Sequence, residues 1–391
     1  MFAARTDWDL VPTRLAKCLA ERRAAGLPVL DLTETNPTRC GLGVDECALL
    51  GGLADPGNLR YEAAPMGLPE ARAAVATYYA AKGVALTPDR ICLTASTSEA
   101  YAFLFRLLAD FGDEVLVPRP SYPLLDFLAE LNDVALTPYP LIYDGQWRIE
   151  MDALRAAIGP RARALVLVNP NNPTGSFVRA SEQGAILDLC RALGLALIAD
   201  EVFADYAFEP GENRVSTLAG TADVLTFVLG GLSKVAALPQ MKLAWIAASG
   251  PPGHVRAALE RLEVIGDTYL SVGTPIQRAV PAILAGRAEI QERVLARLRA
   301  NHREVCDQLG RGGRVEALHA EGGWSVILRL PGAPDDEAWA LRLLERDGVL
   351  VHPGHLFDFP VPGHLVESLL PPEEVFREGL ARLVARAEEG S

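Results

Sequence analysis

Short apolar runs without polar alternation recur along the chain between residues 70 and 250. They occupy residues 90–94, 113–118, 133–141, 163–168, 195–199, 223–231 and 242–249. Strands of this kind are buried on both faces, as in a parallel sheet that helices cover. The segments between the runs are longer and amphipathic, and this alternation of strand and helix is typical of an α/β domain.

One amphipathic segment, residues 98–112, carries signals for both ends of a helix. Ser96 and Glu99 have the spacing of a capping box, and Gly112 is a residue type that often ends a helix. We therefore expect a helix that begins near Ser96, directly after the strand at residues 90–94.

The pattern changes after about residue 275, where long charged helices precede "GWSVILRL", another helix and "GVLVHPG". We predict a large α/β domain at residues 46–275. Residues 1–45 and 276–391 are predicted to form a smaller α+β domain together. Gly and Pro residues are dispersed, and we find neither an internal repeat nor a disordered linker.

The composition indicates a folded protein that acts on small molecules. The chain has 391 residues, of which 50% are hydrophobic, enough for a large buried core. Its formal net charge of -13 argues against nucleic acid or an anionic membrane as partner, because both require a basic protein face.

Cysteines, histidines and the N-terminal segment suggest a cytoplasmic protein without a metal. The six cysteines show no CxxC pair and no metal-ligand spacing, which is typical of reduced thiols. We expect neither a signal peptide nor a membrane span, because charges interrupt every apolar run near Met1. His352 and His355 have a metal-like spacing, but they flank a Pro-Gly turn, so no metal is expected.

Ligands of open α/β sheets bind beyond the carboxyl ends of the strands, so residues there are the candidate site. "ASTSEA" after residues 90–94 places hydroxyls at a helix N-terminus, which suits a phosphate, although an ordinary serine-rich cap has the same pattern. Tyr122 in "RPSYP" offers an aromatic face to a planar ligand, or simple packing in a turn. The amides of "NPNNPTG" can hydrogen-bond a ligand or their own loop.

Asp200 and Lys234 each follow an apolar strand. Burial of Asp200 is unfavourable without a cation, so it either caps the next helix or meets a protonated ring nitrogen. Lys234 lies in "GGLSKVAALPQMKLAW", where lost hydration lowers the pKa of the amine and favours a Schiff base. These groups together match pyridoxal 5'-phosphate. Its phosphate, flat ring, phenolic oxygen, ring nitrogen and aldehyde would meet the hydroxyls, the aromatic face, the amides, the carboxylate and the amine, respectively.

From about Asp31 to its C-terminus, the chain resembles the class I/II aminotransferases, a family of fold-type I pyridoxal-phosphate enzymes. The resemblance is carried, in order, by "RYEAAPMGLPEAR", "TASTSEA", "PSYP", "NPNNPTG", "DEVFADY" and "LSK". It implies a mostly parallel central sheet with helices on both faces in a large cofactor-binding domain, plus a smaller α+β domain. It also implies a homodimer with shared active sites and a cis bond between Asn172 and Pro173.

The resemblance assigns a role to each motif position. Lys234 would form the Schiff base and later move a proton, and Asp200 would hold the proton of the ring nitrogen. The remaining implied contacts are Asn172 to the phenolic oxygen, Tyr122 to the ring face, Ser96, Thr97, Ser233 and Lys242 to the phosphate, and Tyr61 to the phosphate of the neighbouring subunit.

Three cofactor positions depart from the family pattern. Phe203 stands where a tyrosine usually donates to the phenolic oxygen, and Gly231 stands where a serine usually contacts the phosphate, which leaves Ser233 as a partial substitute. Lys242 replaces an arginine that clamps the phosphate, so the charge is kept but the bidentate fork is lost. A structural surface lysine is the alternative interpretation of Lys242.

A fourth departure concerns the substrate. Relatives carry an arginine for the substrate carboxylate near the position of Val366, whereas this chain has Glu367 nearby, which would repel a carboxylate if it pointed inward. Arg39 and Asn36 in "ETNPTRCG" are the candidates for substrate binding. An ordinary surface arginine is an equally good interpretation of Arg39.

The motifs predict a pyridoxal-phosphate-dependent aminotransferase of amino-acid metabolism, which moves an amino group between an amino acid or amine and a keto acid in two half-reactions. Other chemistries share this fold and cofactor, so a decarboxylase or a β-eliminating lyase remains the alternative. "DLTETNPT" is similar to the "NENP" element of histidinol-phosphate aminotransferases and phosphothreonine decarboxylases. A cofactor-binding transcription regulator is disfavoured by the acidic charge and by the early start of the family pattern.

Overall fold

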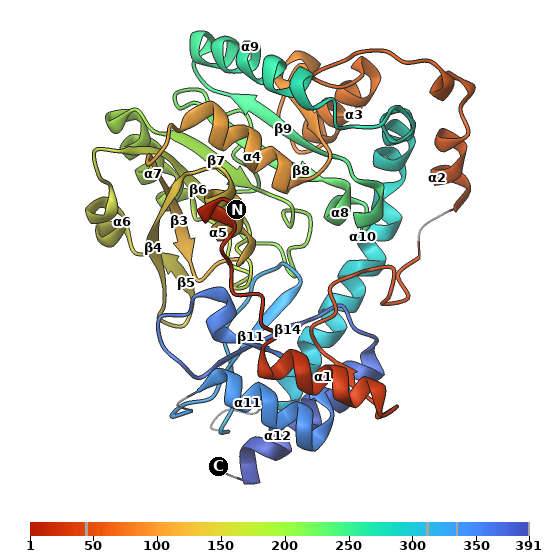
Figure 1. The fold of residues 1–391 in the computed structure, drawn as a ribbon, viewed down its shortest axis with the longest axis vertical. Helices are drawn as coiled ribbons and strands as arrows, with labels where there is room; N and C mark the ends of the chain where they lie inside the picture. The colour runs from red at the N-terminus through yellow and green to blue at the C-terminus, as the bar shows by residue number, and fades with distance from the viewer. Residues whose placement is uncertain (44–45, 310–312, 334, 390–391) are drawn as a thin grey trace.

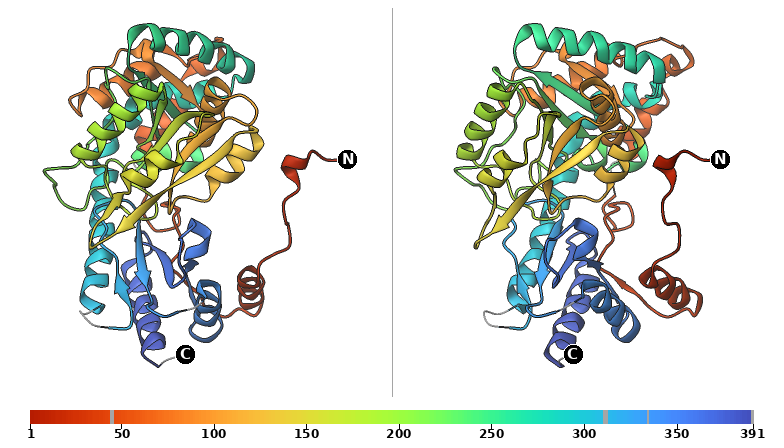
Figure 2. Two further views of the ribbon diagram at one scale, coloured as in Figure 1. Left: turned by 90° about the vertical axis from the view of Figure 1, so that its left-hand side faces the viewer. Right: turned by 60° about the vertical axis from the view of Figure 1, so that its left-hand side comes forward.

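The structure is a computed structural model that describes residues 1–43, 46–309, 313–333 and 335–389. Figure 1 shows a large sheet with its helices above a smaller sheet, and α10 runs alongside both. The N-terminal segment extends along the outside of the molecule before it enters the lower part (Figure 2).

The large sheet has eight strands in the order β2-β9-β8-β7-β6-β3-β4-β5. Its strands are β2 (Ile91–Thr94), β3 (Glu114–Arg119), β4 (Ala135–Tyr143), β5 (Trp147–Ile149), β6 (Ala162–Val168), β7 (Ala196–Asp200), β8 (Thr226–Gly231) and β9 (Ala244–Ser249). Neighbours from β8 through β7, β6 and β3 to β4 are parallel, whereas β9 and β5 are antiparallel to theirs. All seven predicted apolar runs are strands of this sheet, which confirms the mostly parallel α/β architecture.

Helices cover both faces of the large sheet, and this explains why the strand sequences lack polar alternation. One face packs against α4 (Thr97–Leu108), α5 (Leu124–Leu131) and α9 (Pro252–Tyr269). The other packs against α3 (Pro69–Ala80), α6 (Met151–Ala157), α7 (Ala180–Leu193) and the start of α10 (Thr274–Gln308). Along β6, for example, Val166 faces the first set and Leu165 faces the second.

Helix α4 begins as predicted but ends earlier. The Ser96 hydroxyl accepts a hydrogen bond of 3.1 Å from the Glu99 amide, which confirms Ser96 as the N-cap. The Glu99 carboxylate accepts from the Ala95 amide rather than from that of Ser96, so the capping box is not the regular one. Because Ala109 is extended, the helix stops at Leu108, and Gly112 lies in the following turn with a φ of +78°.

The small sheet has the order β10-β11-β14-β13. Its strands are β10 (Glu316–Ala317), β11 (Ser325–Arg329), β14 (His364–Ser368) and β13 (His352–Pro353), and α11 (Asp336–Arg342) and α12 (Glu373–Glu389) belong to the same part of the chain. After α1 (Arg14–Ala24), strand β1 (Leu30–Asp31) pairs in parallel with β12 (Val349–Leu350), which joins the N-terminal segment to the C-terminal part. The predicted boundary between residues 275 and 276 falls in the first turn of α10 and stays a prediction.

Short elements complete the described chain. They are α2 (Glu46–Leu53), α8 (Leu232–Val235), the 3-10 helices η1 (Ala4–Thr6), η2 (Pro56–Leu59), η3 (Pro88–Arg90), η4 (Pro239–Met241) and η6 (Gly354–Phe357), and the π-helix η5 (Leu343–Asp347). No helix in the described ranges combines the length and the apolar composition needed to cross a membrane. Five cysteines are free thiols, while the side chain of Cys47 lies outside the described residues.

Candidate active site

A cavity of about 310 Å³ lies at the carboxyl ends of β6, β7 and β8, and residues at the start of β11 close it from the other side. This volume is in the range of small-molecule sites. Of the predicted site residues, it is lined by Ser96, Thr97, Tyr122, Asn172, Asp200, Ser233, Lys234 and Lys242. The parallel sheet therefore brings together side chains that are far apart in the sequence.

Lys234 lies in α8, directly after β8, and its partly buried side chain lines the cavity. Burial lowers the pKa of Lys234 to about 8, and the nearby Asp200 carboxylate opposes this by raising it. The Lys234 amine faces the rings of Trp324 and Phe203, with 4.7 and 5.5 Å to the ring centres. The Tyr206 hydroxyl donates a hydrogen bond of 2.6 Å to the Lys234 carbonyl, so the backbone of the lysine is also held.

Asp200 is the last residue of β7, next to β8 in the sheet. Its carboxylate accepts hydrogen bonds from the Tyr101 hydroxyl at 3.1 Å and from the Val202 amide at 3.2 Å. Burial raises the pKa of Asp200 to about 6, although both hydrogen bonds and the positive charge of Lys234 lower it. A cation bound in the cavity would therefore stabilise the ionised form of Asp200.

Three hydroxyls and a second amine also line the cavity. Ser96, Thr97 and Ser98 lie at the N-terminus of α4, where free amides and the helix dipole favour an anion. Lys242 contributes an exposed side chain to the same cavity from a backbone with a φ of +49°. Residues other than glycine rarely adopt this conformation, and such strain concentrates at functional sites.

Gly231 also lines the cavity, and its lack of a side chain has a local reason. A Cβ atom there would lie 3.0 Å from the Cβ of Ala244 on the neighbouring strand β9 and 3.4 Å from the Leu243 carbonyl oxygen. A serine at this position would require a shift of β9, which leaves Ser233 as the cavity hydroxyl nearest in sequence.

Asn172 and Tyr122 line the cavity from two loops. The bonds Arg119–Pro120, Asn169–Pro170 and Asn172–Pro173 are cis, which confirms the prediction made for the last of them. Tyr122 is half-exposed, so its ring is accessible to a ligand. Phe203 lines the cavity too, and its ring packs edge-on against Trp324 at 5.5 Å between the ring centres.

Three predicted site residues do not line this cavity. Tyr61 is 77% exposed and borders a separate surface pocket. The Asn36 side chain accepts hydrogen bonds from the amide and hydroxyl of Thr38. Arg39 forms an ion pair of 3.3 Å with Glu34, and its side chain is 73% exposed.

Glu367 does not point into the cavity. It pairs with Val326 across β11 and β14, and the side chains of paired residues lie on the same face of a sheet. Val326 belongs to the small-domain core, so the repulsion considered for an inward Glu367 does not arise. The carboxylate is fully buried without a described hydrogen-bond partner, and burial raises the pKa of Glu367 to about 8.

Several residues of the site were not predicted from the sequence. Tyr101, which contacts Asp200, follows the predicted "ASTSEA" motif by one position, so the start of α4 could have indicated it. Thr35, Trp324 and Ser325 line the cavity from the N-terminal segment and from the start of β11. Thr35 directly precedes the predicted Asn36, so the "ETNPTRCG" motif could have indicated it. No local pattern indicated Trp324 and Ser325, because their place depends on how the small domain packs on the large one.

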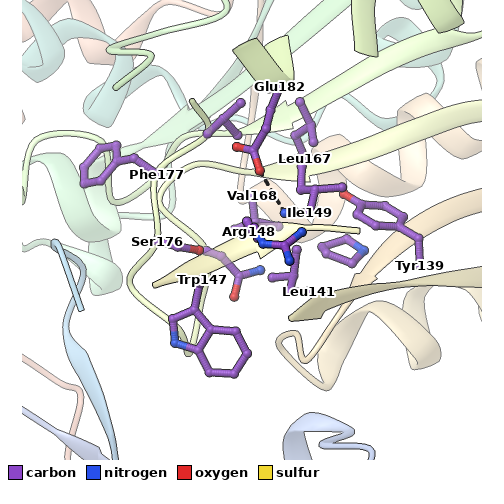
Figure 3. Close-up of a pocket in the computed structure, with 13 residues that line it drawn as sticks. Tyr139, Leu141, Trp147, Arg148, Ile149, Leu167, Val168, Ser176, Phe177 and Glu182 are labelled. Carbon is purple, nitrogen blue, oxygen red and sulfur yellow. Dashed lines mark hydrogen bonds between the residues drawn. The ribbon is translucent and has the colours of Figure 1, made fainter. Parts of the chain in front are cut away.

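A second, smaller cavity lies behind the "NPNNPTG" loop (Figure 3). Its volume of about 20 Å³ leaves room for little more than a water molecule. Both charged residues that line it are already engaged: the Glu182 carboxylate accepts hydrogen bonds of 2.8 Å from the amides of Ile149 and Arg179, and Arg148 pairs with Asp144 at 2.8 Å. This small cavity therefore has no room for a cofactor or a substrate.

Comparisons with known proteins agree with this geometry. The chain matches the family model described as aminotransferase class I and II over residues 53–376. It is 27% identical over 354 residues to the glutamate-pyruvate aminotransferase AlaA of Escherichia coli K12, covering 88% of this chain and 87% of that protein. It is 30% identical over 320 residues to the alanine aminotransferase of Mycobacterium tuberculosis, covering 78% and 73%. An alanine aminotransferase structure from Pyrococcus furiosus has a TM-score of 0.91 at 25% identity, with 100% of both chains covered.

Proposed function

The chain belongs to the class I and II aminotransferases, which makes it a pyridoxal-phosphate-dependent enzyme that transfers amino groups. We propose that Lys234 binds the cofactor covalently in the cavity described above. The observation that carries this proposal is the meeting of a partly buried amine and a partly buried carboxylate in one cavity, at the ends of the adjacent strands β8 and β7. Helix capping would explain Asp200 alone, but it would not explain why the Lys234 amine lines the same cavity.

The residues present fit pyridoxal phosphate. The partly buried Lys234 amine, with its pKa lowered to about 8, suits a nucleophile for the aldehyde. Asp200 would hold the ring-nitrogen proton, Asn172 would donate to the phenolic oxygen, and Tyr122 would cover the ring face. Ser96, Thr97, Ser233 and Lys242 would bind the phosphate.

The bound cofactor supplies an electron sink that makes the carbon beside the amino group acidic. The side chains of this chain supply the rest. A carboxylate at Asp200 favours a proton on the ring nitrogen, and Tyr101 and Val202 orient that carboxylate. An amine at Lys234 with a pKa near neutrality can both accept and release the proton of the reacting carbon.

We further propose that two copies of the chain associate and that Tyr61 reaches the phosphate site of the partner. Tyr61 is 77% exposed and lies away from the cavity of its own chain, and both facts support a role in a neighbouring subunit. A dimer would cover this large apolar side chain together with the exposed Leu59.

We propose an amino acid and a keto acid as substrates and the cytoplasm as location. The names of the relatives, glutamate-pyruvate and alanine aminotransferase, support substrates of this class. Arg39 and Asn36 remain candidates for substrate binding, although Arg39 would first have to leave Glu34. The cysteine pattern, with no CxxC pair, supports the location.

Product analysis tests this function against a decarboxylase or a lyase of the same fold. The cofactor-loaded enzyme is mixed with one amino acid at a time, without an acceptor. Transamination predicts loss of the visible cofactor absorbance and one equivalent of keto acid per site. Release of carbon dioxide, or of pyruvate together with ammonia over many turnovers, would contradict it.

A further inference from the structure

Hydroxyl groups form the wall of the cavity that the N-terminal segment and the small domain supply. Thr35 and Ser325 line this wall, and Ser325 pairs with the buried Ser368 across β11 and β14. The Leu32 carbonyl accepts a hydrogen bond of 2.7 Å from the Ser368 amide. This bond places the N-terminal segment beside β14, and Thr35 reaches the same cavity as Ser325.

The register of the two strands determines which side chains face the cavity side. Residues paired across neighbouring strands share a face, and faces alternate along each strand. Ser325 with Ser368 and Ile327 with Val366 therefore lie on one face, whereas Val326 and Glu367 lie on the other. The cavity side of the small sheet thus offers hydroxyls and apolar groups, and the acidic Glu367 is turned away.

Among the described residues, the cations that line the cavity are Lys234 and Lys242. In the proposed function both of them bind the cofactor. The two nearby arginines are engaged elsewhere. Arg39 pairs with Glu34, and Arg119 pairs with Asp126 at 2.6 Å and with Asp358 at 2.9 Å. Among the described residues of one chain, no arginine lines the cavity, so no guanidinium is placed there to receive a substrate carboxylate.

We propose that Thr35 and Ser325 bind the substrate carboxylate through hydrogen bonds from neutral hydroxyls, and that the enzyme takes monocarboxylic amino acids and their keto acids. This inference rests on the proposed function and names the substrate class of the same site. Neutral hydrogen bonds are weaker and less geometrically specific than bidentate guanidinium contacts, but two hydroxyls together still favour a carboxylate over an apolar group.

The apolar part of the cavity lining disfavours a second carboxylate. Leu124, Leu125 and Leu128 of α5 line the cavity, and so does Phe203 beside Trp324. A second charge placed there would lose its hydration without meeting a cation, which is strongly unfavourable. An apolar side chain would instead gain from burial against these residues.

A matched pair of ligands tests the hydroxyl site. 2-Methylalanine carries a carboxylate where tert-butylamine carries a methyl group. Neither has a hydrogen on the reacting carbon, so neither can be transaminated, and absence of carbon dioxide release is checked for 2-methylalanine. Their dissociation constants are measured from the absorbance of the cofactor in the loaded enzyme. Thr35→Val and Ser325→Ala should each raise the dissociation constant of 2-methylalanine about fivefold to tenfold. The dissociation constant of tert-butylamine should stay unchanged. Thr33→Val, on the same segment but outside the cavity lining, removes a hydroxyl that donates to Asp31; it is the control and should change neither constant.

A second measurement compares norleucine with glutamate in the single half-reaction. We expect the rate constant at low substrate concentration to be at least tenfold higher for norleucine. Glutamate at equal or higher rate, or unchanged 2-methylalanine affinity in both variants, would overturn the inference. If no amino acid reacts although Lys234 holds the cofactor, the proposed function fails, and the two ligand affinities still decide whether the hydroxyl site exists.

Discussion

The Lys234 amine lies 4.7 Å from the centre of the Trp324 ring, and this contact joins the end of a strand in the large sheet to the start of the small one. Aromatic faces attract cations by about 0.5–2 kcal/mol, so the ring favours the protonated amine. Burial favours the neutral amine more strongly and lowers the pKa of Lys234 to about 8.

Replacement of Trp324 should therefore lower the pKa of Lys234 further. Trp324→Leu removes the aromatic face but keeps an apolar neighbour, so the pKa of Lys234 should fall by about 0.5 or more. Trp324→Phe keeps a face and should change the pKa less. The measurement is the pH dependence of the rate at which apoprotein binds added pyridoxal phosphate covalently. An unchanged or higher pKa in the leucine variant would contradict a role of the ring.

The same rate in the unaltered apoprotein gives a direct prediction. The neutral amine is the nucleophile, so the rate should rise with pH through a midpoint near 8, the lowered pKa of Lys234, instead of 10.5, the ordinary lysine value. Measurements from pH 7 upward avoid the titration of Asp200, whose pKa is about 6. A midpoint above pH 10 would show that the amine is hydrated rather than buried.

Loss of the Tyr101 hydroxyl should weaken cofactor binding. The hydroxyl donates to the Asp200 carboxylate, and a hydrogen bond to a charged group contributes about 1.5–3 kcal/mol. In Tyr101→Phe the pKa of Asp200 should rise further, and the affinity for pyridoxal phosphate near pH 7 should fall about tenfold. The matched control is Tyr139→Phe, which removes a buried hydroxyl that donates to the Val166 carbonyl instead. Equal effects of the two variants on affinity would argue against the Asp200 contact.

Glu367 should make the protein less stable as the pH rises. Its pKa is raised from 4.5 in the unfolded chain to about 8 in the fold, so the folded state binds the extra proton between these values. The free energy of unfolding should then decrease from about pH 4.5 to pH 8, by about 1.4 kcal/mol for each pH unit in this window.

The variant Glu367→Leu removes this titration. It should unfold at a higher denaturant concentration than the unaltered protein at pH 8, by several kcal/mol. At pH 5 the two proteins should differ much less, because Glu367 is then protonated in the fold. A stability difference that does not depend on pH would show that the carboxyl finds a partner in solution.

The sequence was sufficient to predict the large sheet and one half of the site. Strands buried on both faces carry continuous apolar runs, and parallel strands bring their carboxyl ends to one edge. Asp200 and Lys234 follow two such strands, so their meeting could be inferred from the sequence alone. The cis bond at Asn172–Pro173 was predicted from the resemblance and is present.

The other half of the site could not be predicted, because it depends on register and on packing between domains. Ser325 and Glu367 are both polar residues in apolar strands, and the register of β11 against β14 decides which of them faces the cavity. Trp324 reaches Lys234 because the small domain packs on the large one. The position of Arg39 follows from its ion pair with Glu34, which no pattern in the segment required.

The central claim is that Lys234 carries the cofactor and Lys242 helps to hold its phosphate. Borohydride reduction of the loaded protein, followed by mass analysis of its peptides, tests this directly. We expect the covalent adduct on Lys234 in the unaltered protein, no adduct in Lys234→Ala, and an adduct that forms with weakened cofactor retention in Lys242→Ala. An adduct that persists in Lys234→Ala and disappears in Lys242→Ala would contradict the account.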